Sequence, residues 1–166
     1  MEILHYPDPR LRLPSKPVTE VTPELQQQLR EMLTLMYDAP GVGLAAPQVN
    51  IQLRMVVIDV SEAKDTPLFF INPEIVEKSG SCSGDEGCLS VPGIWEQVKR
   101  AEWVKVQALD IEGKPFTTEA EGLLAICIQH EIDHLNGILF VDHLSRLKQM
   151  RLRKKIEKAE RKRGID

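Results

Sequence analysis

A chain of 166 residues that is 42% hydrophobic and 28% charged fits one compact domain with a sizeable core. Its first residues lack a positively charged region followed by an apolar run, and no stretch is long enough to span a bilayer. We therefore expect a cytoplasmic protein with no membrane partner, in which three cysteines favour ligand or core roles over a disulfide framework.

The net charge of −4 hides an asymmetry between the body and the end of the chain. Residues 145–166 contain ten Lys and Arg against three Asp and Glu, whereas the remainder is acidic. Such a segment is most often a solvated helix face, and the functional alternative is attraction to a polyanion such as RNA. Without interleaved aromatic residues, any such contact would be with phosphates rather than bases.

The first 22 residues are rich in proline and are predicted to be irregular. A helix then begins, because Thr22 can cap it and Pro23 suits its first position, and Pro40-Gly41 ends it. The apolar residues of one face are Leu25, Leu29, Met32, Leu33 and Met36. We interpret this face as core packing rather than as a cofactor site.

Residues 41–48 form a segment of small residues that is predicted to be a loop in which the backbone can come close to a ligand. The glycine spacing matches neither the dinucleotide-binding fingerprint nor the Walker phosphate loop. Gln48 is the only side chain of the segment that can donate a hydrogen bond.

Strands are predicted over Leu53 to Val60 and over Leu68 to Asn72, with Pro73 ending the second. Alternating apolar residues at 104–108 and at 116–120, with a turn between them, predict a hairpin with one buried face. Strands followed by one central helix, with helices at both chain ends, argue for an α+β fold of antiparallel or mixed strands packed around that helix.

The central helix carries the strongest short pattern of the sequence, in which Glu131 follows His130 and His134 comes four residues after the first histidine. Positions i and i+4 project from one helix face, so both imidazoles can reach one metal ion. The carboxylate between them can accept a proton from a metal-activated water. The preceding apolar run, Leu123 to Ile128, predicts a buried helix, in which such a polar cluster needs compensation.

A hydrolytic metal site uses three protein ligands and keeps one position open, so a third ligand must come from elsewhere. The protease pattern with a third histidine six residues on fails, because position 140 is Phe140. Glu157 and Glu160 lie in the basic tail, and His143 lies beyond the predicted helix end at Asn136-Gly137.

Two cysteines remain as candidates for the third ligand. Cys127 precedes His130 by three residues and shares its face, although its apolar surroundings suit a core thiol. Cys88 lies in a glycine-flanked segment that is predicted to be a loop, free to swing toward the helix. Spacing alone gives Cys88 only a slight lead.

Three separated segments, residues 41–48, 86–90 and 129–137, resemble the three signature motifs of the peptide deformylase family, in the family's order. The resemblance continues through residues 6–12 and 123–144, so it covers essentially the whole chain. Members of this family remove the N-formyl group from the initiator methionine of new bacterial polypeptides and release formate. The resemblance therefore implies a metal-dependent amide hydrolase that acts on N-formylmethionyl nascent peptides.

The resemblance also implies a role for individual residues. The implied metal ligands are Cys88, His130 and His134, and Glu131 is the implied general acid and base. Oxyanion stabilisation falls to the Gln48 side-chain amide and the Leu89 backbone N–H. The family's physiological metal is Fe(2+), and Zn(2+), Ni(2+) or Co(2+) can occupy the same site.

The family pattern further implies an apolar pocket for formyl-methionine beside the metal. Its walls would be Val42, Glu86, Leu123, Ile126 and Cys127, with backbone hydrogen bonds from Gly43 and Gly87. Gly84 departs from close relatives, which often carry an aliphatic residue there, so the pocket wall is expected to differ at that position. We also place Asp133 and Arg100 behind the metal ligands as a hypothesis.

Residues 1–144 are expected to form the catalytic domain and residues 145–166 a basic C-terminal helix extension of it. In some bacterial members a similar helix docks on the ribosome near the exit tunnel, so ribosomal RNA is an expected partner. Nothing in the pattern demands more than a monomer. Two other functions are weighed against the deformylase: a zinc endopeptidase, and a binding module in which a metal with four protein ligands is structural.

Overall fold

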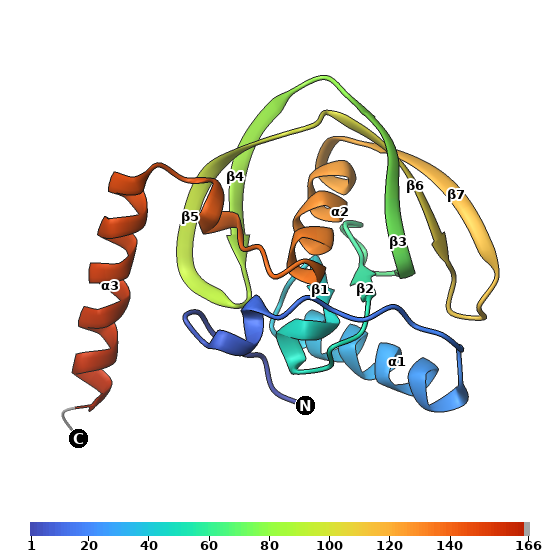
Figure 1. Cartoon of the computed structure of the whole chain (residues 1–166), viewed down its shortest axis with the longest axis horizontal. Helices are drawn as coiled ribbons and strands as arrows, with labels where there is room; N and C mark the ends of the chain where they lie inside the picture. The colour runs from blue at the N-terminus through green and yellow to red at the C-terminus, as the bar shows by residue number, and fades with distance from the viewer. Residues whose placement is uncertain (165–166) are drawn as a thin grey trace.

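The computed structural model describes residues 1–164, whose helices and strands are labelled in Figure 1. The helices are α1 (Pro23–Asp38), α2 (Gly122–Leu135) and α3 (Arg146–Gly164), with short 3-10 turns η1 (Pro9–Arg12), η2 (Ala46–Val49) and η3 (Phe140–His143). The strands are β1 (Gly43–Ala45), β2 (Met55–Ile58), β3 (Leu68–Ser79), β4 (Cys82–Cys88), β5 (Val91–Arg100), β6 (Trp103–Leu109) and β7 (Pro115–Glu121). Within these residues no helix combines the length and the apolar character that a membrane crossing requires.

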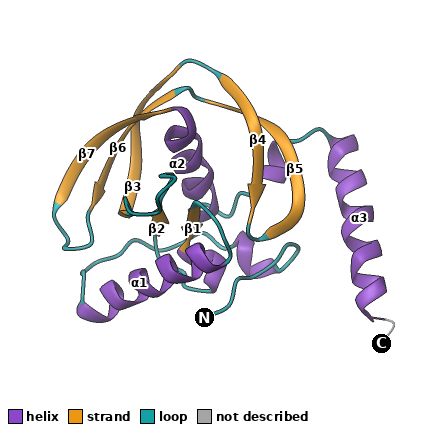
Figure 2. Cartoon of the chain, turned by 180° about the vertical axis from the view of Figure 1, so that it is seen from behind, coloured by secondary structure: helices purple, strands orange, loops and turns teal. Residues whose placement is uncertain are grey.

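The strands form two antiparallel sheets that arch around α2, which lies between them in both views (Figures 1 and 2). The larger sheet has the order β1-β2-β3-β6-β7, and β4 and β5 form a separate hairpin. One isolated parallel bridge joins Lys16 to Leu53. The predicted α+β fold, with strands packed around a central helix and helices near both ends, is confirmed.

Helix α1 begins where its sequence predicts. The Thr22 hydroxyl accepts a hydrogen bond from the Leu25 N–H at 3.2 Å, and Pro23 occupies the first turn. Four of the five predicted apolar positions are buried, and Leu33 is partly buried. The helix thereby packs against β1, which leads directly to Gln48, and against β2.

The prediction that Pro73 ends a strand is wrong, because β3 continues to Ser79. Its pairing with β6 is irregular between Ile71 and Glu74, and Asn72 has a left-handed φ of 52°. A proline cannot donate to a sheet ladder, but a bulge removes the need for that bond. The Asn72 side chain instead joins the backbone of Val18 in both directions, at 2.8 and 2.9 Å.

Helix α2 supplies the centre of the main core. Ala125, Cys127, Ile128 and Leu135 pack with apolar residues of β2, β3, β6 and β7. The expectation of a helix buried on all sides is wrong at its start, where Leu123 is 56% exposed. Leu123 instead lines a cavity that residues of β4 and β5 also border.

The end of α2 is held by the N-terminal segment. Gly137 has a φ of 74°, and a side chain at this position would collide with the Arg12 carbonyl. The Arg12 guanidinium donates to the Gly137 carbonyl at 3.2 Å, and the Ser15 N–H donates to the Leu135 carbonyl at 2.8 Å. The bond from Ser15 satisfies a carbonyl that the helix end leaves unpaired, and the bond from Arg12 holds the turn that follows the helix.

Helix α3 lies at one side of the body, next to β5 (Figure 1). Leu152 is buried and Ile156 partly buried against Phe140 and its neighbours, whereas most other side chains of the helix are exposed. Lys148 forms an ion pair of 3.4 Å with Glu96 of β5. The last two residues of the expected extension, 165 and 166, lie outside the described residues.

Candidate metal centre

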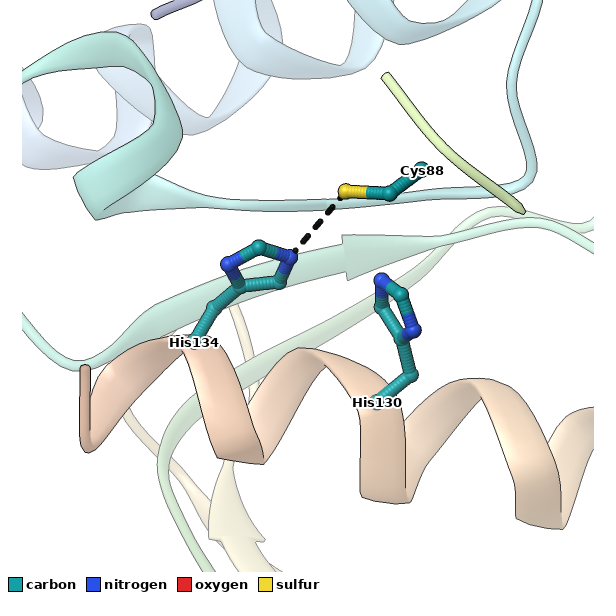
Figure 3. Close-up of side chains that lie close together, drawn as sticks. All are labelled: Cys88, His130 and His134. Carbon is teal, nitrogen blue, oxygen red and sulfur yellow. Dashed lines mark hydrogen bonds between the residues drawn. The ribbon is translucent and has the colours of Figure 1, made fainter. Parts of the chain in front are cut away.

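Helix α2 presents His130, Glu131 and His134 from its last two turns, and all three are buried. The two imidazole centroids lie 5.0 Å apart and meet edge to face. Both rings rise from one side of the helix toward Cys88 (Figure 3). The spacing of i and i+4 thus brings the two histidines to one point, as the sequence predicts.

Cys88 comes from the other sheet. It is the last residue of β4, directly before the two-residue turn Leu89-Ser90 that leads into β5. The predicted loop at this place is wrong, because residues 82–100 form a hairpin that fixes the cysteine rather than letting it swing. Its Sγ lies 3.3 Å from His134 Nε2.

The three side chains fit a divalent metal. One donor atom from each of Cys88, His130 and His134 lies within 4.8 Å of the others. A thiolate with two neutral imidazoles suits iron, zinc, nickel or cobalt, and three protein ligands leave a position open for chemistry. Cys127, which the sequence left open as the third ligand, is not part of this cluster, and neither is His143.

Glu86 fixes the orientation of the first imidazole. Its carboxylate lies 2.9 Å from His130 Nδ1, which leaves Nε2 free to face Cys88. Arg100 holds the same carboxylate with two bonds of 2.8 Å. Burial opposes ionisation of Glu86, but Arg100 and His130 together lower its pKa below the usual value.

The hydrogen-bonded network continues to the surface. Arg100 also donates to Asp133 at 2.7 Å, and His143 Nε2 lies 2.9 Å from the same carboxylate oxygen. Asp133 therefore supports the site through Arg100 and Glu86, and its own imidazole partner is His143 rather than His130 or His134. Within residues 1–164, the Nδ1 of His134 is buried without a hydrogen-bond partner.

Glu131 is 3% exposed, and its Oε1 also has no hydrogen-bond partner among the described residues. Burial raises the pKa of Glu131 to about 7. A Cβ added at Gly43 would lie 2.5 Å from Oε2 of this carboxylate, so only glycine leaves room for it. A poorly solvated carboxylate of this kind is suited to exchanging protons near neutral pH.

Gln48 lies in η2, where the predicted loop of small residues folds into a short strand and a 3-10 turn. Its Oε1 accepts from the Ala45 N–H at 2.8 Å. Its Nε2 donates to the Ser90 hydroxyl at 3.0 Å and lies 3.5 Å from Cys88 Sγ. The amide nitrogen therefore faces the cysteine, which lies next to Leu89.

A cavity of about 550 Å³ opens beside these groups. It is lined by Gln48, Cys88, Leu89, His130 and Glu131 and by all the residues expected to bind substrate, namely Val42, Gly43, Glu86, Gly87, Leu123, Ile126 and Cys127. The carboxylate of Glu86 is engaged by Arg100 and His130, so this residue contributes to the wall as a paired group. At Gly84, a Cβ would lie 3.7 Å from the Ile126 side chain.

Sequence reasoning missed two residues of this region. Trp95 is 69% exposed at the cavity and its ring covers Gly87 so closely that a Cβ there would lie 2.7 Å away. Ser90 is fully buried behind Gln48. Ser90 ends the motif at residues 86–90, which could have drawn notice to it, whereas the position of Trp95 over Gly87 depends on the pairing of β4 with β5.

Comparison with known proteins gives consistent matches over the whole chain. A family model described as Polypeptide deformylase matches residues 1–150. A peptide deformylase of Chromobacterium violaceum is 57% identical over 161 residues, covering 97% of this chain and 96% of that protein.

Solved structures agree with these matches. A crystal structure of a peptide deformylase from Legionella pneumophila has a TM-score of 0.93 at 52% identity, covering 99% of this chain and 98% of the other. One from Synechococcus elongatus in complex with actinonin has a TM-score of 0.89 at 44% identity, covering 96% and 88%.

Proposed function

The chain belongs to the polypeptide deformylase family, and from this premise we propose that Cys88, His130 and His134 hold the metal with which it works. The protein is a hydrolase that removes the N-formyl group from the N-terminal formyl-methionine of newly synthesised proteins. The reaction adds water across the formyl amide and releases formate and a free amine.

One observation carries the assignment of the site. A cluster of three donor atoms suited to a metal lies beside the buried carboxylate of Glu131, and both face a cavity that opens to solvent. A structural metal site would close with a fourth protein ligand and would leave this carboxylate without a purpose. The arrangement instead supports hydrolysis.

We propose Fe(2+) as the resident metal, with Zn(2+), Ni(2+) or Co(2+) able to take its place. The donor set of one thiolate and two imidazoles accepts each of these ions. When bound, the metal supplies a Lewis acid that polarises the formyl oxygen and acidifies water. Cys88 beside iron is also a site at which oxidation would inactivate the protein.

Glu131 is proposed to move the proton. Its pKa of about 7 lets the carboxylate accept a proton from the attacking water and later deliver it to the departing amine. A side chain at position 43 would collide with this carboxylate, so Gly43 is needed for Glu131 to keep its place. Glu131 then acts as base and acid in one cycle.

Gln48 and Leu89 are proposed to stabilise the negative charge that develops on the formyl oxygen. The Gln48 amide nitrogen faces the cysteine, and the Leu89 N–H belongs to the turn directly after it. Loss of one such donor typically costs about 3 kcal/mol of barrier height. The Gln48 side chain is held by the Ala45 N–H and the Ser90 hydroxyl, and the Leu89 N–H lies in the turn of the β4–β5 hairpin.

The methionine side chain is proposed to enter the apolar part of the cavity. Val42, Leu123, Ile126 and Cys127 supply its walls, and the backbones of Gly43 and Gly87 can bond the peptide. Because Gly43 cannot carry a side chain without displacing Glu131, the space for the small formyl group is narrow. Larger acyl groups should therefore be excluded.

The decisive experiment measures formate release from a formyl-Met-Ala-Ser peptide by anaerobically prepared, Fe(2+)-loaded protein. Glu131→Ala should lower kcat by about 10²- to 10⁴-fold, the range for loss of a general acid and base. Glu157→Ala, an exposed glutamate of α3, is the matched control and should keep full activity.

Failure to release formate from metal-replete wild-type protein would contradict the proposal. Cleavage of unformylated peptides at internal bonds would then identify an endopeptidase. Metal held by four protein ligands, with neither activity, would identify a binding module.

We further propose that residues 1–144 form the catalytic domain and residues 145–166 a ribosome-contacting extension in a cytoplasmic, monomeric protein. Arg151, Lys155 and Lys158 are exposed on α3 at spacings that form one stripe. Basic side chains that neutralise RNA phosphates give an affinity for RNA that falls as the salt concentration rises.

The ribosome proposal can be tested with the triple variant Arg151→Glu, Lys155→Glu, Lys158→Glu. This variant keeps the buried Leu152 that truncation after Leu144 would remove. We expect turnover of formyl tripeptides to be unchanged and salt-sensitive co-sedimentation with ribosomes to be lost. Undiminished co-sedimentation would count against the proposal.

A further inference from the structure

The two-residue turn between β4 and β5 contains a buried polar side chain that the proposed mechanism does not use. Ser90 is fully buried, and its hydroxyl accepts a hydrogen bond from Gln48 Nε2 at 3.0 Å. Its backbone N–H points to Cys88 Sγ at 3.4 Å. One residue therefore touches both a proposed oxyanion donor and a proposed metal ligand.

The hydrogen bonds of its oxygen and its nitrogen fix the orientation of the Gln48 side-chain amide. Oε1 accepts from the Ala45 N–H, so it must be the oxygen that faces this backbone donor. Nε2 then carries two hydrogens, and the shorter contact is to Ser90, at 3.0 Å against 3.5 Å to Cys88 Sγ. The second hydrogen lies on the side of the cysteine.

The backbones of Gln48 and Ser90 are held at a fixed separation. The Leu4 N–H donates to the Gln48 carbonyl, and the Tyr6 N–H donates to the Ser90 carbonyl, each at 2.7 Å. Alternate residues of one extended segment thus tie η2 to the hairpin turn. The distance between the serine hydroxyl and the amide is therefore set by the fold and is not a chance contact of two mobile side chains.

From this geometry we propose that Ser90 is the positioning residue for Gln48. Its hydroxyl engages one amide hydrogen, which turns the other toward the formyl oxygen of a substrate at the metal. The proposal rests on the proposed function, because it assumes that Gln48 serves the oxyanion. Ser90 itself does not touch the substrate, so its contribution passes through the amide.

The expected signature is a loss in kcat that depends on Gln48. Ser90→Ala should lower kcat by about 10- to 100-fold, because a donor displaced by about 1 Å loses much of its effect, while KM changes little. In a Gln48→Ala background the same substitution should cost almost nothing further, because the group through which it acts is gone. If the fold-losses in kcat of the two single variants instead multiply in the double variant Gln48→Ala, Ser90→Ala, the proposal is overturned.

A second readout does not depend on activity. In Zn(2+)-loaded protein with nitrogen-15 label, one of the two Gln48 side-chain amide protons should be protected from solvent exchange and distinct from its partner. Ser90→Ala should change the chemical shifts of these two amide protons and remove the protection from exchange. Ser15→Ala, which removes another buried serine hydroxyl, should leave both unchanged.

The same spectra separate the possible failures. If both Gln48 protons exchange freely in wild-type protein, the proposal is overturned even if Ser90→Ala does not fold. If wild-type protein releases no formate while the spectra behave as expected, the proposed function has failed and the hydrogen bond stands. If Ser90→Thr, which keeps the hydroxyl, restores the protected proton, the effect belongs to the hydrogen bond and not to packing.

Discussion

Helices α2 and α3 handle charge in opposite ways. Helix α2 buries Glu131 and two histidines, and the groups behind them form a connected network that reaches Arg100. Helix α3 leaves nearly all its charges in water and buries Leu152 alone among its described side chains. Buried charge is costly unless it is paired, so it is kept in α2 where chemistry requires it. Exposed charge costs little, so α3 can carry many.

The largest effect expected from this comparison is loss of a ligand on α2. His134→Ala should weaken metal binding by more than about 100-fold, since even loss of a group behind a ligand costs about 10- to 100-fold. His5→Ala is the matched control, because this exposed histidine lies outside the donor cluster and far along the chain from α2. Metal content after dialysis measures both, and equal losses would refute the ligand assignment.

The buried carboxylate of α2 should also cost stability when no metal is present. The pKa of Glu131 is about 7 in the folded protein, against 4.5 for a solvent-exposed glutamate such as that of the unfolded chain. Between these two pH values the folded state therefore binds more protons than the unfolded state. Its contribution to stability is therefore complete below about pH 4 and is lost as pH rises through 7.

Glu131→Gln should consequently stabilise metal-free protein by on the order of 2 to 3 kcal/mol at pH 8, and much less at pH 5. Denaturant unfolding in the presence of a chelator measures the difference. Equal stabilisation at the two pH values would show that the carboxylate is not the source.

A smaller effect is expected at the outer part of the network. Asp133→Asn removes a charge from Arg100 and should weaken metal retention by about 10-fold, because the orientation of Glu86 and His130 then relaxes. Asp8→Asn is the control, since that carboxylate pairs with Arg10 at the surface. Unchanged metal content in Asp133→Asn would remove this residue from the support of the site.

The smallest effect is expected on α3. The ion pair between Lys148 and Glu96 is half-exposed, and such pairs contribute about 0 to 1 kcal/mol to the free energy of unfolding. Lys148→Ala should therefore leave the denaturation midpoint almost unchanged. A loss of stability as large as that from a buried pair would mean that α3 is held more tightly than its exposure indicates.

Local patterns predicted the parts of the fold that depend on neighbours in sequence. Thr22 caps α1 and the two histidines of α2 meet because both results follow from helix geometry alone. The extension of β3 past Pro73 did not follow, because the bulge there depends on the partner strand and on a side-chain bond between Asn72 and Val18.

The candidate site divides in the same way. The pattern in α2 indicated a metal, but spacing could not choose between Cys88 and Cys127, because Cys88 approaches α2 only through the pairing of β4 with β5. The bonds from Glu86 to Arg100 and from Gln48 to Ser90 also join distant segments. The family resemblance named several of these residues, and only the folded chain reveals what each of them touches.

The extended N-terminal segment has a consequence for how the protein folds during synthesis. Its hydrogen-bond partners lie far along the chain, and Arg12 and the Gly137 carbonyl are 125 residues apart. Contacts of such separation form slowly, because chain entropy is lost before they contribute. The segment leaves the ribosome long before α2, yet can find its last partner only after α2 has emerged. A protein that acts on newly begun chains thus completes its own site late in its own synthesis.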